Sequence, residues 1–435
     1  MARTGTTPRG GLARWALVVV AALLIVWRAP QYLVAPSFWA EDGMFFFAGA
    51  WNAGPLRGLV QRPAGYLVLY ANVATSLAAL LVQAGVISLA TAPRVTAVAA
   101  LLAQLVPVVL LAFARAPAWG GWWRRAGAIA IVLFGARTGG MWLNTVNSQY
   151  FLALAAIIVL LEPAGVGRVR RWVYAAIVAL ATLAGPVASF VTPLFLLKAW
   201  RTRARSVMLL AAVSSVCSGI QLGVIALGGI GAASPRAQGL SAPVLAMLAW
   251  TRTVVLPVLG RDAALAFTNR LGPTLALMGT PLVVSAPVFS GLMLGTLALV
   301  VAILALGAPR EVRWWLAGSY ALVTVGSYVG AVGDLRGLLR SFEGAARYFF
   351  VPSVLILWLL LLNVRPDRRV QSLVCGALLA VGLGISAWSW RETVRWQATW
   401  PVWADEVAAW ERDPRTPLHI WPAGWTMRLF ARRTP

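Results

Sequence analysis

Apolar runs of about 20 residues recur along the whole chain, separated by short segments that contain arginine, glycine or proline. A helix needs roughly 20 such residues to cross a bilayer, so the pattern predicts an all-α, polytopic helical membrane protein with about eleven transmembrane helices. The predicted spans are residues 12–28, 65–90, 94–114, 141–161, 172–184, 187–200, 206–227, 288–306, 312–331, 348–363 and 370–388.

Arginine-rich linkers orient these spans, because arginine is enriched on the cytoplasmic side of membrane proteins. Residues 168–171, 201–205 and 365–369 therefore predict one cytoplasmic face, with a cytoplasmic amino terminus and an extracytoplasmic carboxyl-terminal tail. The first run, residues 15–27, has no convincing small-residue cleavage site after it and reads as an uncleaved span.

Residues 126–137 are apolar too, yet a further span there would move either the first loop inside or the arginine-rich linkers outside. We therefore predict that this stretch lies partly in the membrane or at the outer interface, beside the anchoring residues Trp119, Trp122 and Trp123.

The outer segments divide the chain into a transmembrane module and a tail. They are the first loop, residues 29–64, with an interfacial helix at 44–53; residues 232–287, with a second interfacial helix at 244–258; and the tryptophan-rich tail, residues 390–435, after the module 1–389. Indole rings in the tail would stack on sugars or anchor the tail at the membrane surface.

Composition agrees with this architecture and excludes nucleic-acid binding. Hydrophobic residues make up 60% of the chain and charged residues 11%. The net charge of +24 comes from short arginine clusters between apolar runs, with no single basic face, and Lys198 is the only lysine. Cys217 and Cys375 both lie inside apolar runs, so no disulfide is predicted.

Two adjacent carboxylates in the first loop are the main candidates for chemistry. Glu41 and Asp42 lie in the aromatic stretch WAEDGMFFF, where a charged group is costly unless it is paired or used. As an alternative, Asp42 merely caps the helix that follows, which leaves Glu41 unexplained. A carboxylate in this place could act as a general base towards an acceptor hydroxyl.

Two outer arginines could receive a departing phosphate. Arg62 ends the first loop and Arg347 begins the tenth span, although either could simply snorkel to the interface. Tyr348 offers a phenol to a phosphate or sugar oxygen, and Glu343 could hold Arg347 in place.

Amides cluster in the segment NTVNSQYF, at the outer start of the fourth span. Asn144, Asn147 and Gln149 either join helices together or bind a polar substrate. His419 has no nearby Cys or His partner, so a zinc site is not predicted. No cofactor is predicted, and a divalent cation between Glu41 and Asp42 is the one metal alternative.

Six short motifs together resemble bacterial integral-membrane glycosyltransferases of the GT-C superfamily. They are FWAEDG, GYL, NSQY, GPVASFVTPLFLL, RYFFVP and LHIWPAGW. The resemblance implies a GT-C-like fold in the bacterial inner membrane and transfer of a sugar from a polyprenyl-phosphate donor to a cell-envelope glycan or lipid acceptor, on the extracytoplasmic face. It implies an acidic base in the first outer loop, Asp42 or Glu41, of which we favour Asp42. It also places Arg347 and Tyr348 at the lipid phosphate.

Two other readings keep the membrane architecture. A transporter or flippase of lipid-linked sugars would bind the same phosphate without chemistry, but no charged residue is expected to be buried near the middle of a span and no two-half symmetry is visible. A non-catalytic assembly protein would leave the carboxylates without a purpose.

Overall fold

The computed structural model describes residues 8–135, 140–228, 241–276, 286–330, 335, 337–340, 346–395 and 401–431, and it is almost entirely helical. The α-helices are α1 (Pro8–Arg28), α2 (Gln31–Val34), α3 (Ala48–Ala53), α4 (Pro55–Gly58), α5 (Leu69–Gln83), α6 (Ala92–Ala112), α7 (Trp122–Phe134), α8 (Ser148–Leu161), α9 (Arg168–Leu183), α10 (Thr192–Thr202), α11 (Arg205–Gly228), α12 (Ala242–Trp250), α13 (Leu256–Ala276), α14 (Ala286–Gly307), α15 (Arg313–Gly330), α16 (Gly337–Arg340), α17 (Ala346–Leu362), α18 (Arg369–Arg395) and α19 (Trp403–Arg412). Shorter 3₁₀ or π segments are η1 (Asp42–Phe47), η2 (Leu89–Thr91), η3 (Pro117–Trp119), η4 (Pro186–Val191) and η5 (Thr251–Val255).

Within these described residues, six stretches are long and apolar enough to cross a membrane. They are Gly11–Arg28, Leu89–Ala112, Arg205–Leu227, Ala242–Leu271, Ala286–Gly307 and Arg369–Trp388. The pair Arg168–Leu183 and Pro186–Thr202 passes the same test together and is bent by 118° at Gly185-Pro186. The chain is therefore an all-α membrane protein in its main part, and the count of eleven spans stays a prediction.

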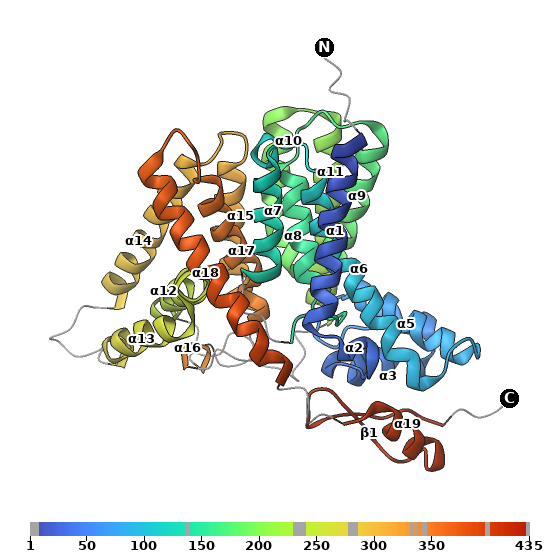
Figure 1. The fold of residues 1–435 in the computed structure, drawn as a ribbon. Helices are drawn as coiled ribbons and strands as arrows, with labels where there is room; N and C mark the ends of the chain where they lie inside the picture. Colours follow the sequence, from blue (N-terminus) through green and yellow to red (C-terminus); the bar gives the residue numbers. More distant parts are fainter. Residues whose placement is uncertain are drawn as a thin grey trace.

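Helix α8 lies at the centre of the bundle (Figure 1). All fourteen of its residues are buried, as expected for a helix that is apolar on every side and enclosed by other helices. Pro163 follows its last turn, and the residue before a proline is disfavoured in the helical conformation. The helix is about 21 Å long at 1.5 Å per residue, so its two ends separate two regions of the molecule.

The three arginine-rich linkers lie at one end of the bundle, together with the start of α1 (Figure 1). Arg170 pairs with Glu162 at 3.8 Å, and Ser206 donates to the carbonyl of Ala164, which joins two of the linkers. We call this the arginine-rich end. Its common location agrees with the sequence prediction, whereas its side of the membrane stays predicted.

Helix α7 begins at the arginine-rich end, which corrects the prediction for residues 126–137. Arg125 donates to the carbonyl of Ala114 at 3.1 Å, and the amide of Arg115 donates to Glu162 at 2.9 Å. Trp119, Trp122 and Trp123 therefore lie at the same end as the arginine-rich linkers, whereas sequence analysis placed them at the opposite end.

The predicted span at residues 65–90 is also corrected, and the two corrections compensate each other. The helix there is only α5, of 15 residues, and the segment after it meets the tail, since Trp403 donates to the carbonyl of Leu89 at 3.2 Å. The chain thus stays near the first loop through α5, α6 runs towards the arginine-rich end, as predicted for residues 65–90, and α7 runs back, as predicted for residues 94–114. The parity argument at residues 126–137 failed because it assumed that residues 65–90 run from one end of the bundle to the other, whereas α5 begins beside the first loop and the segment after it meets the tail.

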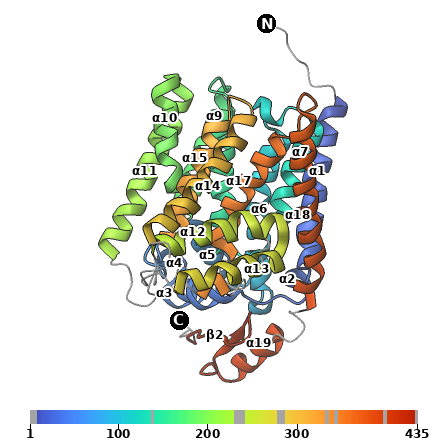
Figure 2. The same cartoon turned by 90° about the vertical axis from the view of Figure 1, so that its left-hand side faces the viewer.

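The segment predicted as an outer loop at residues 232–287 is largely helical where it is described. Helices α12 and α13 lie across the direction of the long helices, towards the end that holds α2 and α3 (Figure 2). Gly260 breaks α13 with φ of 83°, a conformation that costs an L-residue energy and glycine very little. A helical segment at 244–258 agrees with the prediction, although its composition would equally allow it to cross a membrane.

The tail ends in a small folded unit. Strands β1 (Leu418–Ile420) and β2 (Trp425–Met427) pair antiparallel, with Leu418 opposite Met427. Helix α19 and this hairpin share an apolar cluster with the first loop and with the α5–α6 turn; its members include Phe38, Phe47, Ala78, Leu89, Trp403, Val407, Leu418 and Ile420. The tryptophan-rich tail is therefore packed onto the first loop.

Candidate functional site

The two adjacent carboxylates point to different partners. Asp42 is 1% exposed and accepts hydrogen bonds from the amides of Thr145 at 2.6 Å and Val146 at 2.8 Å. No side-chain cap is made at the start of η1, so the capping role considered for Asp42 is wrong. Its carboxylate instead joins the first loop to a segment about 100 residues away, residues 140–147.

Burial controls the ionisation of Asp42. Loss of hydration raises the pKa of its carboxyl group from the ordinary value of 3.8 to about 7, although the amides of Thr145 and Val146 stabilise the charged form and act in the opposite direction. The negative charge of Glu41 raises this pKa further. Asp42 thus changes protonation near neutral pH.

The amides of the 140–147 segment bind mainly to the segment itself. Asn147 donates to Asn144 Oδ1 at 2.7 Å, and both side chains donate to the carbonyl of Gly140. Gln149 donates to the carbonyl of Val146 at 3.2 Å. These three predicted substrate residues are buried and these hydrogen bonds are local, so both helix joining and substrate binding stay predictions.

A turn predicted from the sequence closes onto Gln149. Gly185 lies against this side chain so tightly that a Cβ at Gly185 would overlap its amide. The Gly-Pro turn and the NSQY motif are therefore one packed unit, and only glycine fits at this contact.

Glu41 forms an ion pair with Arg347. Its Oε1 lies 3.0 Å from Nη1 of Arg347, with the two side chains 20% and 25% exposed. The guanidinium of Arg347 also lies over the ring of Tyr348, 5.4 Å from its centroid, and Tyr348 meets Tyr150 edge to face at 6.2 Å. Three segments that sequence analysis named separately, at residues 41–42, 144–150 and 347–348, thus meet at one place.

For two other predicted members of the site, the structure describes no contact with this group. Arg62 is exposed, and its side chain makes no hydrogen bond or ion pair with any described residue. Glu343, predicted to hold Arg347, lies outside the described residues. The partner of Arg347 that the structure does describe is Glu41.

The carboxylates do not form a shared cation site. Both oxygens of Asp42 accept amide hydrogens and Glu41 faces a guanidinium, whereas Mg²⁺ or Ca²⁺ would need these oxygens to converge. Within the part of the chain that is described, no group of three His, Cys, Asp or Glu residues could hold a metal ion. The arrangement does not fit the divalent cation considered from sequence.

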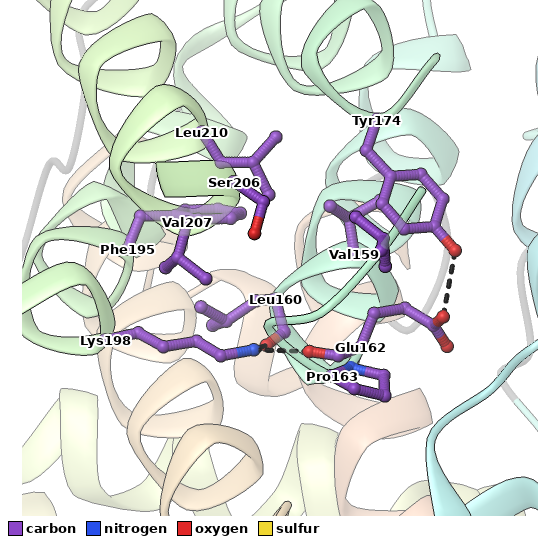
Figure 3. A pocket seen from close by; sticks show the side chains of 11 residues that line it. Val159, Leu160, Glu162, Pro163, Tyr174, Phe195, Lys198, Ser206, Val207 and Leu210 are labelled. Atoms are coloured by element: carbon purple, nitrogen blue, oxygen red, sulfur yellow. Dashed lines mark hydrogen bonds between the residues drawn. The ribbon is translucent and has the colours of Figure 1, made fainter. Parts of the chain in front are cut away.

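A second polar cluster lies at the arginine-rich end, around Glu162 (Figure 3). Glu162 accepts from the amides of Arg115 and Ala116 and from the Tyr174 hydroxyl at 2.9 Å. Lys198 donates to the carbonyls of Leu160 at 2.5 Å and Glu162 at 2.6 Å. The cavity between them holds about 10 Å³, room for one water molecule. This cluster joins helix ends and does not accommodate a substrate.

Sequence analysis drew no function from Glu162 or from Lys198. Both are almost fully buried. The signal for Lys198 was present, because it is the one lysine of an arginine-rich chain and follows the apolar run PLFLL. Glu162 had no comparable signal, since its three donors come from other segments of the chain.

Arg252 is a buried cation that sequence analysis missed. It is 1% exposed, lies over the ring of Phe349 at 5.1 Å and donates to the carbonyl of Leu338. It belongs to the stretch Ala242–Leu271, which is long and apolar enough to cross a membrane. Sequence analysis placed this stretch in an outer loop, so the expectation that no charged residue is buried near the middle of a span stays a prediction.

Comparison with known proteins adds no identification: no family model matches the chain, and no curated protein or solved structure is similar to it.

Proposed function

We propose that the protein is a membrane glycosyltransferase of the GT-C type. It transfers a sugar from a polyprenyl-phosphate donor to a cell-envelope glycan or lipid on the extracytoplasmic face of the bacterial inner membrane. The single observation that carries this proposal is the ion pair of Glu41 and Arg347, partly exposed and bordered by Tyr348 and Tyr150. A base for the acceptor hydroxyl and a cation for the leaving phosphate are what a lipid-phosphate sugar transfer requires, and phenols beside them can donate further hydrogen bonds.

In this mechanism Arg347 exchanges its partner. The donor phosphate binds the guanidinium, which releases Glu41 to accept the proton of the acceptor hydroxyl. The acceptor oxygen bonds to the anomeric carbon while the bond from that carbon to the phosphate oxygen breaks. The leaving phosphate keeps the electron pair, and Arg347 and the Tyr348 hydroxyl stabilise its charge.

The two carboxylates have different roles in this proposal. Glu41 is the base because it is the more exposed and faces Arg347. Asp42 is the positioning residue because both of its oxygens hold the 140–147 segment in place. Sequence reasoning favoured Asp42 as the base, and this assignment remains the alternative that the experiment distinguishes.

The experiment is transfer from a radiolabelled polyprenyl-phosphate sugar by the purified protein, compared among Glu41→Gln, Asp42→Asn and wild type. We expect Glu41→Gln to lower kcat by about 10²–10⁴-fold, the usual contribution of a general base, without loss of folding. Asp42→Asn is expected to lower stability together with activity. Normal transfer by Glu41→Gln would exclude it as the base, and normal transfer by both variants would exclude the mechanism.

A transporter or flippase of lipid-linked sugars is the second candidate, and the burial of Arg252 favours it. Ser353 donates to the Arg252 carbonyl at 3.2 Å, and the Thr253 and Tyr320 hydroxyls lie 2.6 Å apart, so η5 carries polar groups into the bundle. Movement of a fluorescent lipid-phosphate sugar across reconstituted vesicles, with no transfer to any acceptor, would establish this candidate instead.

A further inference from the structure

The tail reaches the first loop next to the carboxylates. The Trp421 amide donates to the Phe38 carbonyl at 3.0 Å, and the Ala40 amide donates to the Trp421 carbonyl. These bonds form an isolated parallel bridge between Trp39 and Trp421. Because the segment before Trp39 has no regular structure, the tail supplies the backbone partners of the residues directly before Glu41.

The side chains at this bridge extend the contact in two directions. Trp421 is buried and meets Tyr32 edge to face at 5.2 Å. On the other side, a Cβ at Gly140 would lie 2.7 Å from Cη2 of Trp39, so this indole packs directly against the start of the 140–147 segment. Trp39 therefore lies between the tail and the segment that holds Asp42.

The stretch after the carboxylates also rests on the tail. A Cβ at Gly43 would lie 2.7 Å from Cδ1 of Ile420, a separation that real Cβ atoms do not show. The backbone at residues 38–43 is thus held by the strand β1 and by Trp421 at both ends of the Glu41-Asp42 pair.

Other contacts keep the tail docked without this bridge. Phe430 donates from its amide to Asn52 at 2.8 Å, and Asn52 donates to the carbonyl of Arg428 at 3.0 Å. Trp403 and Phe38 meet edge to face at 5.4 Å. The bridge at Trp421 can therefore be weakened while the tail remains in place.

We propose that the tail segment Leu418–Trp421 is a positioning element for the carboxylate pair, with Trp421 as its principal positioning residue. The expected change in kcat rests on the proposed function. The expected change in backbone order at residues 38–42 rests on the bridge geometry alone. A loosened 38–42 backbone would let Glu41 leave its alignment with Arg347, and misplacement of a reacting group by about 1 Å can cost about 10²-fold in rate.

The test uses the full-length protein in lipid nanodiscs, with Trp421→Ala, Trp421→Phe and the control Asn52→Ala. Hydrogen exchange of peptides covering residues 38–48 and 140–147 is measured beside transfer from a radiolabelled polyprenyl-phosphate sugar. For Trp421→Ala we expect at least tenfold faster exchange in 38–48, and kcat lowered about 10–100-fold with an unchanged KM for the donor. Trp421→Phe is expected to retain most of the wild-type protection from exchange and most of kcat. Asn52→Ala is expected to leave the exchange rate and kcat near their wild-type values.

Each outcome decides one of the two proposals. Unchanged exchange in Trp421→Ala would overturn the positioning role, as would faster exchange with an unchanged kcat. An equal response to Asn52→Ala would also overturn it, because the effect would then reflect general loosening of the tail. If the wild type transfers no sugar while exchange responds as expected, the glycosyltransferase proposal fails and the structural role of the tail stands.

Discussion

The two ends of α8 carry clusters of similar chemistry that differ in how completely their charges are used. At one end, Glu162, Tyr174 and Lys198 are buried, and their polar groups bind one another or backbone groups. At the other end, Glu41 and Arg347 pair directly but keep about a fifth to a quarter of their side chains exposed. A carboxylate, a cationic side chain and a tyrosine are present in both places.

This difference in exposure distinguishes charged residues that stabilise the fold from those that are free to bind a ligand. Burial of an ionisable group is tolerated when hydrogen bonds satisfy it, and such a group then serves stability. A pair that stays accessible beside two phenols can exchange one partner for a ligand. Residue type alone would have given the two clusters the same role.

After Glu41→Gln, replacement of Arg347 has the largest expected effect. Arg347→Ala should lower transfer from a polyprenyl-phosphate sugar by about 10²–10³-fold, the usual loss when one donor to a developing negative charge is removed. Arg347→Lys should retain part of the activity because the charge remains and the planar fork is lost. Arg57→Ala, on the exposed helix α4, is the control and should stay within about twofold of wild type. Full activity of Arg347→Ala would remove the distinction between the two clusters.

Loss of Glu162 should affect stability and leave the chemistry unchanged. Glu162→Ala leaves three donors without their acceptor, two of them buried, so we expect the free energy of unfolding to fall by about 3 kcal/mol. Glu311→Ala, in the exposed linker before α15, is the matched control and should change it by less than about 0.5 kcal/mol. Denaturant unfolding in detergent measures both, and a normal stability of Glu162→Ala would contradict the structural role.

Per pH unit, the smallest expected effect is a change in stability that arises from Asp42. Its folded pKa of about 7 exceeds the ordinary 3.8, so between these values the folded protein binds more protons than the unfolded chain. The free energy of unfolding should therefore fall as the pH rises from about 4 to about 7, by at most about 1.4 kcal/mol per pH unit. Asp42→Asn should abolish this slope and Glu411→Gln, on the exposed tail helix, should retain it. Equal slopes in all three proteins would show that Asp42 does not titrate in this range.

Much of the helical architecture was predictable from local sequence. The runs at residues 12–28, 206–227, 288–306 and 370–388 coincide with candidate spans, because hydropathy is summed over consecutive residues. The shared end of the arginine-rich linkers followed from the same pattern. Helix α5 was assigned wrongly because composition shows that a stretch is apolar and does not show which direction it takes.

The candidate site was predictable as a set of residues and not as a set of contacts. Glu41, Asp42, Arg347 and Tyr348 were all named from sequence, but the pairing of Glu41 with Arg347 and the burial of Asp42 were not. Arg252 was missed because it is a single charge in an apolar run, and only the packing shows that it is enclosed.

What the sequence determined by itself is the membrane-embedded helical class of the chain and the grouping of its arginines, since both depend on neighbouring residues. The tertiary structure alone decided that Glu41 meets a residue 306 positions later, that Asp42 binds the 140–147 segment and that the tail closes over both. Contacts of this kind depend on where distant helices pack, and hydrophobic packing is non-directional, so no local pattern specifies them.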